Sequence, residues 1–448
     1  MNPPEGAAAP ANNPGTASPP DRKAPWFPAD GAEARIVISG FFLLFCVLGG
    51  YFAVRPVRET IGTVLGRAAT QDLWFFTALF AILIVPFYGW LVARVRRAVL
   101  LPSIYGFMAV AFAATAQIFG DGTMDPMVAR VFYVAISVMN LLLVSAFWSF
   151  MLEILSSDQT KRLFGFIAAG GTLGALLGPG ATALLVKSIG NAGVLYLGAG
   201  MYLMAIVLSR VLLAQWRHIS PEAGSGPGHL SEREKALGGN PFAGFMLVMR
   251  NPYLRAIALF IAGISAINTF LYFEQLDQVE KQFEELAART QVFASLDVTV
   301  QGLVILTQLS LTGFIATRIG VIALLATVPF IMVFGLTVYA VFGTFSVMAA
   351  AMVIRRWGEY ALIRPGREML FSKVDKESKY KAKNVCDVAV YRIADAGFAQ
   401  VKKVLDTVGM GGTAQALIAA SVAALWAING WWLGRRFEKE KEKTGSAA

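Results

Sequence analysis

Stretches of about twenty apolar residues recur along the whole chain, and each is long enough to cross a hydrocarbon core about 30 Å thick. This pattern constrains the fold more than any single motif does. The 448 residues are 56% hydrophobic and only 15% charged, whereas about 25% of the residues in a typical soluble domain are charged. The sequence therefore predicts an all-α polytopic membrane protein.

Twelve such stretches are predicted as transmembrane helices, and a polar segment divides them into two groups of six. The predicted spans are residues 34–54, 73–93, 98–118, 127–152, 163–186, 192–214, 254–274, 292–316, 319–342, 345–363, 383–406 and 413–434. The predicted units are a disordered tail (1–33), an N-terminal bundle (34–215), a linker (216–252), a C-terminal bundle (253–435) and a basic tail (436–448). Two six-helix halves with weak internal repetition are typical of transporters of the major facilitator type.

The positive charges indicate how the helices are oriented. Lys and Arg gather in alternate loops, at 94–97, 161–162, 217–250, 364–381 and 435–443, while the loops between them are neutral or acidic. The positive-inside rule predicts that both termini are cytoplasmic. An even number of spans agrees with this, because it places both termini on the same side. The expected location is a bacterial inner membrane. A nucleic-acid partner is not expected despite the net charge of +10, because exposed aromatic residues do not accompany the basic ones.

The small number of cysteine and histidine residues and the absence of known catalytic motifs disfavour metal binding, disulfide formation and enzymatic hydrolysis. The only cysteines, Cys46 and Cys386, lie in different predicted spans, and the only histidines, His218 and His229, lie in the linker. These residues cannot form a metal cluster or a disulfide framework. The sequence also contains no phosphate-binding loop of the Walker type and no hydrolase motif. We therefore expect neither an enzyme nor a cofactor or metal.

Charged and polar residues inside predicted spans are the candidates for substrate binding, since a charge at the bilayer centre costs about 2.5–3.5 kcal/mol even on the lenient insertion scale. Arg55 and Arg58 flank Pro56, which is expected to end or kink the first helix. Further candidates share helix faces and are expected to line a central cavity: Arg355 with Glu359, Lys383 with Asp387, and Asn268 with Tyr272. An alternative is that Arg356, Glu359 and Arg392 form ion pairs that only fix helix packing.

Each half also carries a charged segment next to a span, and we expect both to act in gating. In the N-terminal half it contains Glu153, Lys161 and Arg162, and in the C-terminal half Glu368, Lys379 and Lys381. The first of these segments has an alternative interpretation as a structural latch. It is followed by Gly170, Gly174 and Gly178, whose four-residue spacing predicts a close helix–helix contact.

Three separated blocks resemble the ATP:ADP antiporter family, the nucleotide transporters of plastids and intracellular bacteria, which is related to the major facilitator superfamily. The blocks are YFAVRPVRETI (51–61), FWSFMLEI followed by KRLFG and a glycine-rich helix (147–178), and KYKAKNVCDVAVYR (379–392). The resemblance implies nucleotide exchange, with basic residues holding phosphates and Glu153 acting in the transport cycle. Arg58 and Glu59 stand where the family usually has Lys and Asp.

The resulting functional expectation is a monomeric secondary active transporter that moves a small anionic solute, most readily a nucleotide, by alternating access. Its partners would be this solute and the lipid bilayer. Proton-coupled transport of an organic anion or another metabolite is an alternative, with Glu153, Glu359 and Asp387 as titratable groups. A lipid scramblase or flippase of the same fold, and a scaffold or receptor that binds without transporting, are further alternatives.

Overall fold

A computed structural model describes residues 31–95, 97–119, 125–155, 157–219, 243–310, 320–374, 382–383 and 385–445. Within these ranges every regular element is helical. The first half contains α1 (Gly31–Leu65), α2 (Arg67–Arg94), α3 (Arg97–Phe119), α4 (Pro126–Ile154) and α5 (Ser157–Ile219). The second half contains α6 (Ala243–Arg250), α7 (Pro252–Gln282), α8 (Leu286–Ser310), α10 (Val321–Phe342), α11 (Phe345–Gly358), η2 (Glu359–Ile363), α12 (Arg364–Leu370), η3 (Phe371–Lys373), η4 (Val385–Val390), α14 (Tyr391–Thr407) and α15 (Gly412–Gly445).

Nine helices of the described residues are long and apolar enough to cross a membrane, so the chain is an integral membrane protein. One of them, α5, contains a break at Gly190, whose φ of 67° and ψ of 178° are not helical. The break falls between the predicted fifth and sixth spans. The segments from α11 to α12 and from η4 to α14 carry several charges and are not among the nine. The count of twelve spans stays a prediction.

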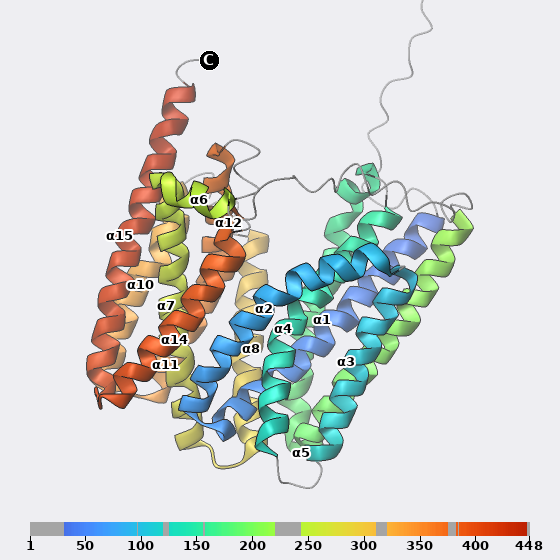
Figure 1. Ribbon diagram of the computed structural model, residues 1–448, viewed down its shortest axis with the longest axis horizontal. Coiled ribbons are helices and arrows are strands. Elements are labelled where there is room, and N and C mark those ends of the chain that lie inside the picture. The colour runs from blue at the N-terminus through green and yellow to red at the C-terminus, as the bar shows by residue number, and fades with distance from the viewer. Residues whose placement is uncertain are drawn as a thin grey trace, which may run out of the picture.

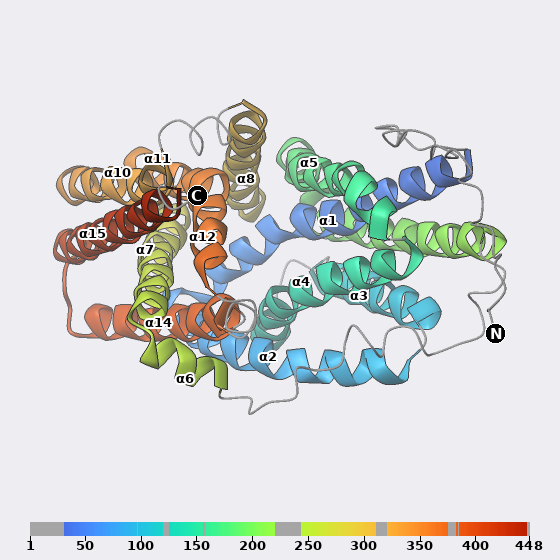
Figure 2. The same ribbon diagram turned by 90° about the horizontal axis from the view of Figure 1, so that it is seen from above.

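The helices form two bundles that lie side by side (Figures 1 and 2). One hydrophobic core contains buried residues of α1, α3, α4 and α5, and a second contains buried residues of α6, α7, α10, α11, α12 and α15. The helices α2 and α8 contribute no buried residue to either core. They pack across the junction between the two bundles, where α2 contacts α14 and α8 contacts α5. A smaller cluster at this junction includes Trp74, Phe273, Phe293 and Ala399.

The first helix is longer than the sequence suggested. Pro56 was expected to end or kink this helix. The helix α1 continues through Pro56 to Leu65, so the first of these two expectations is wrong. Proline removes one backbone donor, and a membrane helix tolerates this where neighbouring groups satisfy the freed positions. The acceptor that Pro56 leaves without its helical donor is the carbonyl of Phe52. The bond that Thr60 Oγ1 donates to the Pro56 carbonyl at 3.1 Å is a separate contact one turn further on. The extension carries Arg55, Arg58 and Glu59 on helical backbone into the junction.

The row of glycines on α5 lies directly against the backbone of α1. A Cβ atom added at Gly170 would lie 2.2 Å from the carbonyl oxygen of Phe41, one at Gly174 would lie 2.5 Å from that of Phe45, and one at Gly178 would lie 2.4 Å from that of Gly49. One turn further, Thr182 Oγ1 donates to the Ala53 carbonyl at 2.8 Å. Both helices therefore meet in a four-residue register that only glycine permits at three of its positions.

We predict that Gly174→Ala destabilises the protein, because its new methyl group would meet backbone atoms of both Phe45 and Gly49, which cannot turn away. Overpacking of this kind costs about 1–3 kcal/mol. The matched control is Gly200→Ala on the same helix, where an added Cβ has no neighbour within 4 Å. Thermal unfolding in detergent should show a lower midpoint for Gly174→Ala only. Equal midpoints for the two variants would contradict this description of the contact.

Candidate functional site

The extended end of α1 places three charged residues beside the C-terminal bundle. Arg55 Nε lies 3.6 Å from Glu59 Oε1, and the guanidinium of Arg58 contacts the same carboxylate. Arg58 Nη1 also donates to Ser137 Oγ on α4 at 3.0 Å. The side chains of Arg55 and Arg58 are 20% and 13% exposed, whereas that of Glu59 is 7% exposed. The two cations therefore keep some access that their shared counter-ion lacks.

The C-terminal bundle contributes a buried ion pair to the same place. Asp297, midway along α8, forms an ion pair with Arg356 on α11, in which Oδ1 lies 2.6 Å from Nη1. The same oxygen, Oδ1, lies 3.7 Å from Arg55 Nη1 on α1. Asp297 is thus placed between a cation of each bundle.

A chain of hydroxyl groups joins these charges to aromatic side chains. Tyr272 on α7 donates to Glu59 Oε2 at 2.6 Å, and its oxygen lies 2.6 Å from the hydroxyl oxygen of Tyr133 on α4. Trp74 Nε1 on α2 donates to that Tyr133 oxygen at 2.9 Å. The predicted site residue Tyr272 therefore connects the C-terminal bundle to both Glu59 and α4.

We call Arg55, Arg58, Glu59, Asp297 and Arg356 the central cluster. Three guanidinium groups against two carboxylates give it a formal charge of +1. Arg58 Nε and Arg356 Nη2 are buried and make no hydrogen bond to a described group. Guanidinium donors in excess over carboxylate acceptors suit the binding of an anion whose oxygens they can share, such as a phosphate or a carboxylate.

A second set of charges lies on the helical segment from α11 to α12, which also carries Arg356 of the central cluster. Arg355 Nη1 donates to Glu359 Oε2 at 2.8 Å, and Arg364 Nη2 lies 3.6 Å from Glu359 Oε1. Arg355 and Glu359 are buried, while the side chain of Arg364 is 52% exposed and stacks over Tyr360. The predicted candidate Asn268 lies one turn before Tyr272 on α7 and is partly exposed.

The predicted candidates Lys383 and Asp387 lie elsewhere. Lys383 Nζ pairs with Glu368 Oε2 at 2.5 Å, and Asp387 Oδ1 pairs with Arg367 Nη2 at 3.2 Å. Both pairs join α12 to the segment around η4 within the C-terminal bundle. The structure therefore brings Arg55, Arg58 and Tyr272 together around Glu59. Arg355 pairs with Glu359 on its own helix instead, and Lys383 and Asp387 pair with residues of α12.

The remaining predicted gating residues lie at the ends of helices. Glu153 is exposed in the last turn of α4, and Arg162, near the start of α5, pairs with Glu33 at the start of α1. The side chain of Lys161 and the whole of Lys379 and Lys381 lie outside the described residues.

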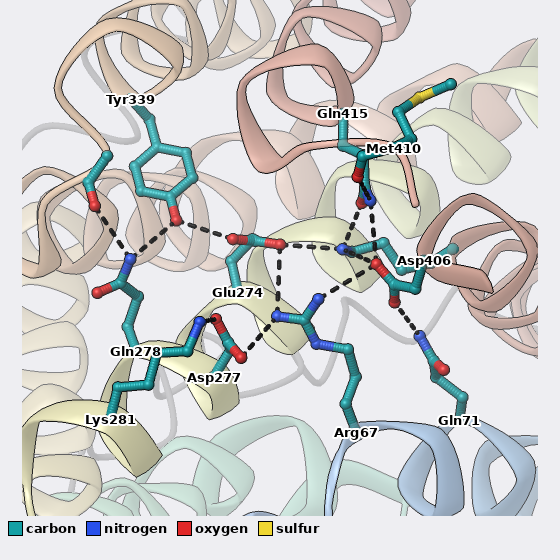
Figure 3. A network of polar contacts seen from close by, with 12 residues as sticks. Arg67, Gln71, Glu274, Asp277, Gln278, Lys281, Tyr339, Asp406, Met410 and Gln415 are labelled. Carbon is teal, nitrogen blue, oxygen red and sulfur yellow. Dashed lines mark hydrogen bonds and ion pairs between the residues drawn. The ribbon is translucent and has the colours of Figure 1, made fainter. Parts of the chain in front are cut away.

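A network of polar contacts joins the bundles where α1 ends and α2 begins (Figure 3). Arg67, the first residue of α2, lies 3.0 Å from Asp277 on α7 and 3.2 Å from Asp406 on α14. Gln71 on α2 donates to the other oxygen of Asp406 at 3.0 Å. We call Arg67, Gln71, Glu274, Asp277, Lys402 and Asp406 the junction network.

The junction network is anchored within the C-terminal bundle. Lys402 Nζ lies 2.9 Å from Glu274 Oε1 and 3.1 Å from Asp406 Oδ1, and it also contacts Gln415 on α15. Tyr339 on α10 donates to Glu274 Oε2 at 2.8 Å. The carboxylates that receive Arg67 are therefore held in place by helices of their own bundle.

Among the described residues, the polar contacts between the bundles lie in one part of the length of the bundles. Those that the described residues make run from the central cluster to the junction network and include Thr60 with Thr290, Arg289 with Thr63, and Lys403 with Asp72. At the opposite end, the described ion pairs, such as Glu33 with Arg162 and Arg367 with Asp387, stay within one bundle. In Figure 1 the bundles lean together at the bottom and apart at the top, where the C-terminus lies.

Sequence reasoning missed some of these residues. Asp297 is the only acidic residue of α8, in an otherwise apolar stretch, so its burial cost was a usable signal. The members of the junction network gave a weaker signal because they lie near span ends, where charges are ordinary. Only their mutual placement in three dimensions sets them apart.

Relatives with known names match most of the chain. The ADP,ATP carrier protein 1 of Chlamydia pneumoniae is 23% identical over 92% of this chain and 85% of the relative. The protein of the same name from Chlamydia trachomatis is 24% identical over 90% of this chain and 87% of the relative.

Solved structures and a family model define the fold. The nucleoside transporter NupG superposes with a TM-score of 0.62 at 14% identity, covering 90% of this chain and 99% of NupG. A bacterial homolog of the human lysosomal transporter Spinster gives a TM-score of 0.59 at 14% identity, covering 92% of this chain and 98% of that chain. The model described as Major Facilitator Superfamily matches residues 31–363. The predicted helical transporter fold is thus confirmed, and the chain belongs to the Major Facilitator Superfamily of secondary transporters rather than to a class of enzymes.

Proposed function

We propose that this protein exchanges nucleotides across a membrane and that its central cluster holds their phosphate groups. The observation that carries the proposal is the convergence of Arg55 and Arg58 from one bundle with Arg356 from the other. Planar guanidinium groups match phosphate oxygens in pairs. The two chlamydial relatives named ADP,ATP carrier protein support a phosphorylated substrate.

The same convergence supports alternating access. A phosphate group that contacts Arg55 and Arg356 together would draw α1 and α11 toward each other. A ligand shifts a conformational equilibrium only by binding one state better than the other. A substrate that satisfies donors from both bundles favours a state in which both bundles surround it, and an uncharged analogue lacks this effect.

The proposal includes an orientation. We place the protein in a bacterial inner membrane with both termini cytoplasmic, because basic residues gather at that side. The junction network then closes the outer end, and the described conformation opens toward the cytoplasm. The moving units are the bundles 34–215 and 253–435. One chain contains the whole cluster, so a monomer suffices.

Residue roles follow from this arrangement. Arg55, Arg58 and Arg356 bind the phosphates, and Tyr272 holds Glu59 in place beside them. The pairs of Lys383 with Glu368 and of Asp387 with Arg367 lie at the cytoplasmic end in this orientation. We assign them, with Glu153 and Arg162, to contacts that change partners when that end closes.

Exchange in proteoliposomes tests the proposal. Uptake of labelled ATP should require ADP inside the vesicles. Arg55→Ala should raise the apparent KM about ten- to hundredfold, because a hydrogen bond to a charged group contributes about 1.5–3 kcal/mol. The matched control is Arg255→Ala, which removes an exposed arginine of α7 away from the cluster.

The outcomes of this assay separate the alternatives. Folded protein that takes up no nucleotide under either condition would refute nucleotide exchange. Uptake that follows a pH gradient without internal ADP would indicate proton coupling instead. Translocation of a labelled phospholipid, with no uptake of ATP, would indicate a scramblase or flippase.

We predict that Arg67→Gln weakens closure of the outer end, because it removes the cation that α2 gives to Asp277 and Asp406. A cysteine placed at Thr63, which is 1% exposed, should then react faster with a membrane-impermeant maleimide added outside. The control is Lys281→Gln, which also removes a partner of Asp277 but one within α7. If both variants react at the parent rate, the junction network does not hold the bundles closed.

A further inference from the structure

Asp297 lies in the central cluster at a position where a bound anion would compete with it for Arg55 and Arg356. It is 4% exposed and is one of two charged residues on α8, the other being Arg289 near its start. Its Oδ1 lies 2.6 Å from Arg356 Nη1 and 3.7 Å from Arg55 Nη1. The first contact is a close ion pair within the C-terminal bundle. The second crosses between bundles and is too long for a hydrogen bond.

Arg55 is therefore the loosely held cation of the cluster. Its two contacts to carboxylates measure 3.6 and 3.7 Å, and a fifth of its side chain is exposed. Arg356 is held tightly on one side, but its Nη2 is buried without a described partner. Donors on both arginines are thus available to an acceptor that reaches between them. Asp297, fixed to α8, satisfies only part of this capacity.

A phosphate group has more acceptor oxygens and more negative charge than a carboxylate. It can accept from Arg356 and Arg55 together. Such a group would compete with Asp297 for the same two guanidinium groups, and the phosphate and the carboxylate would repel each other when both lie close to these groups. The free energy of binding therefore includes an electrostatic cost from Asp297, which rises as the phosphate approaches the Asp297 carboxylate.

We propose that Asp297 is the resident counter-anion of the central cluster and that a substrate phosphate displaces it from Arg55 and Arg356. This inference rests on the proposed function and extends it to a determinant of affinity. Asp297 neutralises the unloaded cluster and disfavours anions too weakly charged to compete with it. It thereby selects for polyanionic phosphates over monoanionic solutes.

Neutralising Asp297 should strengthen phosphate binding. Asp297→Asn preserves the size of the side chain and raises the formal charge of the cluster from +1 to +2. We expect the Kd for ADP and for inorganic pyrophosphate to fall about tenfold, which corresponds to about 1.4 kcal/mol. Binding of adenosine, which carries no phosphate, should not change. Asp297→Glu keeps the charge and should remain within a few-fold of the parent Kd.

The measurement is calorimetric titration of the purified full-length protein in detergent. Asp125→Asn is the matched control, because it removes one carboxylate at the N-cap of α4 while asparagine still caps the helix. If the melting temperature shows that Asp297→Asn does not fold, Asp297→Ser provides the same neutralisation. Unchanged or weaker binding of pyrophosphate by a folded neutral variant would overturn the role of Asp297.

The two proposals fail in different ways. If the parent protein exchanges ATP for ADP but the neutral variants do not bind more tightly, only the role of Asp297 is wrong. If pyrophosphate binds and neutralisation tightens it, yet no nucleotide is exchanged, the counter-anion role stands and the substrate is a different phosphate. If neither ADP nor pyrophosphate binds to the parent protein, both proposals are refuted.

Discussion

A guanidinium group inside a membrane protein requires negative partners, because an unpaired charge there is expensive. Arg55, Arg58 and Arg356 obtain these partners from Glu59 and from Asp297 on α8. This requirement places α1, α8 and α11 at one point although they come from different bundles. The bundles themselves are held by separate apolar cores and by the glycine row between α1 and α5. The central cluster is therefore a point at which two bundles with separate apolar cores contact each other through charged side chains.

The two bundles contact each other at two levels along their length, the junction network and the central cluster. The junction network joins the bundles at one end through the ion pairs of Arg67 with Asp277 and Asp406, and the carboxylates are held by their own bundle. The central cluster lies further along α1 and beside α7. Beyond the cluster, the described ion pairs stay within single bundles. A substrate bound at the cluster would add contacts between the bundles next to the closed end. Rocking about this region would then exchange closure at one end for closure at the other.

Apolar stretches of about twenty residues were sufficient to predict the helical fold, because the bilayer imposes the length of each span. The count of twelve stays a prediction, since the segments from α11 to α12 and from η4 to α14 are not among the nine apolar helices. The four-residue spacing of Gly170, Gly174 and Gly178 identified the glycine row, although not its partner helix, since spacing describes one helix face and not the helix opposite. Arg55, Arg58 and Tyr272 were predicted as site residues, and all three contact Glu59. Arg355 was predicted with them but pairs with Glu359 on its own helix. Lys383 and Asp387 were placed in the same predicted cavity because they lie on one polar face of a predicted helix. A shared face does not show how far across the membrane its residues lie. Lys383 and Asp387 lie beside α12 instead.

Pro56 shows a second limit of local reasoning. Proline terminates many helices in water, yet α1 continues through it, because packing in the bundle outweighs one lost hydrogen bond. The same continuation brings Glu59 to Tyr272 and Arg58 to Ser137. The central cluster depends on this extension, which the local sequence alone did not indicate.

Closure of the bundles is tested most directly by asking whether a phosphate group, rather than a nucleoside, changes the distance between them. Spin labels at Leu152 on α4 and Met249 on α6, both exposed, would report the distance between the ends that lie apart, with Cys46 and Cys386 replaced. We expect ADP to shorten this distance in lipid nanodiscs and adenosine to leave it unchanged. Equal shortening by adenosine, or no change with saturating ADP, would contradict the claim that phosphate bound between arginines of both bundles drives closure.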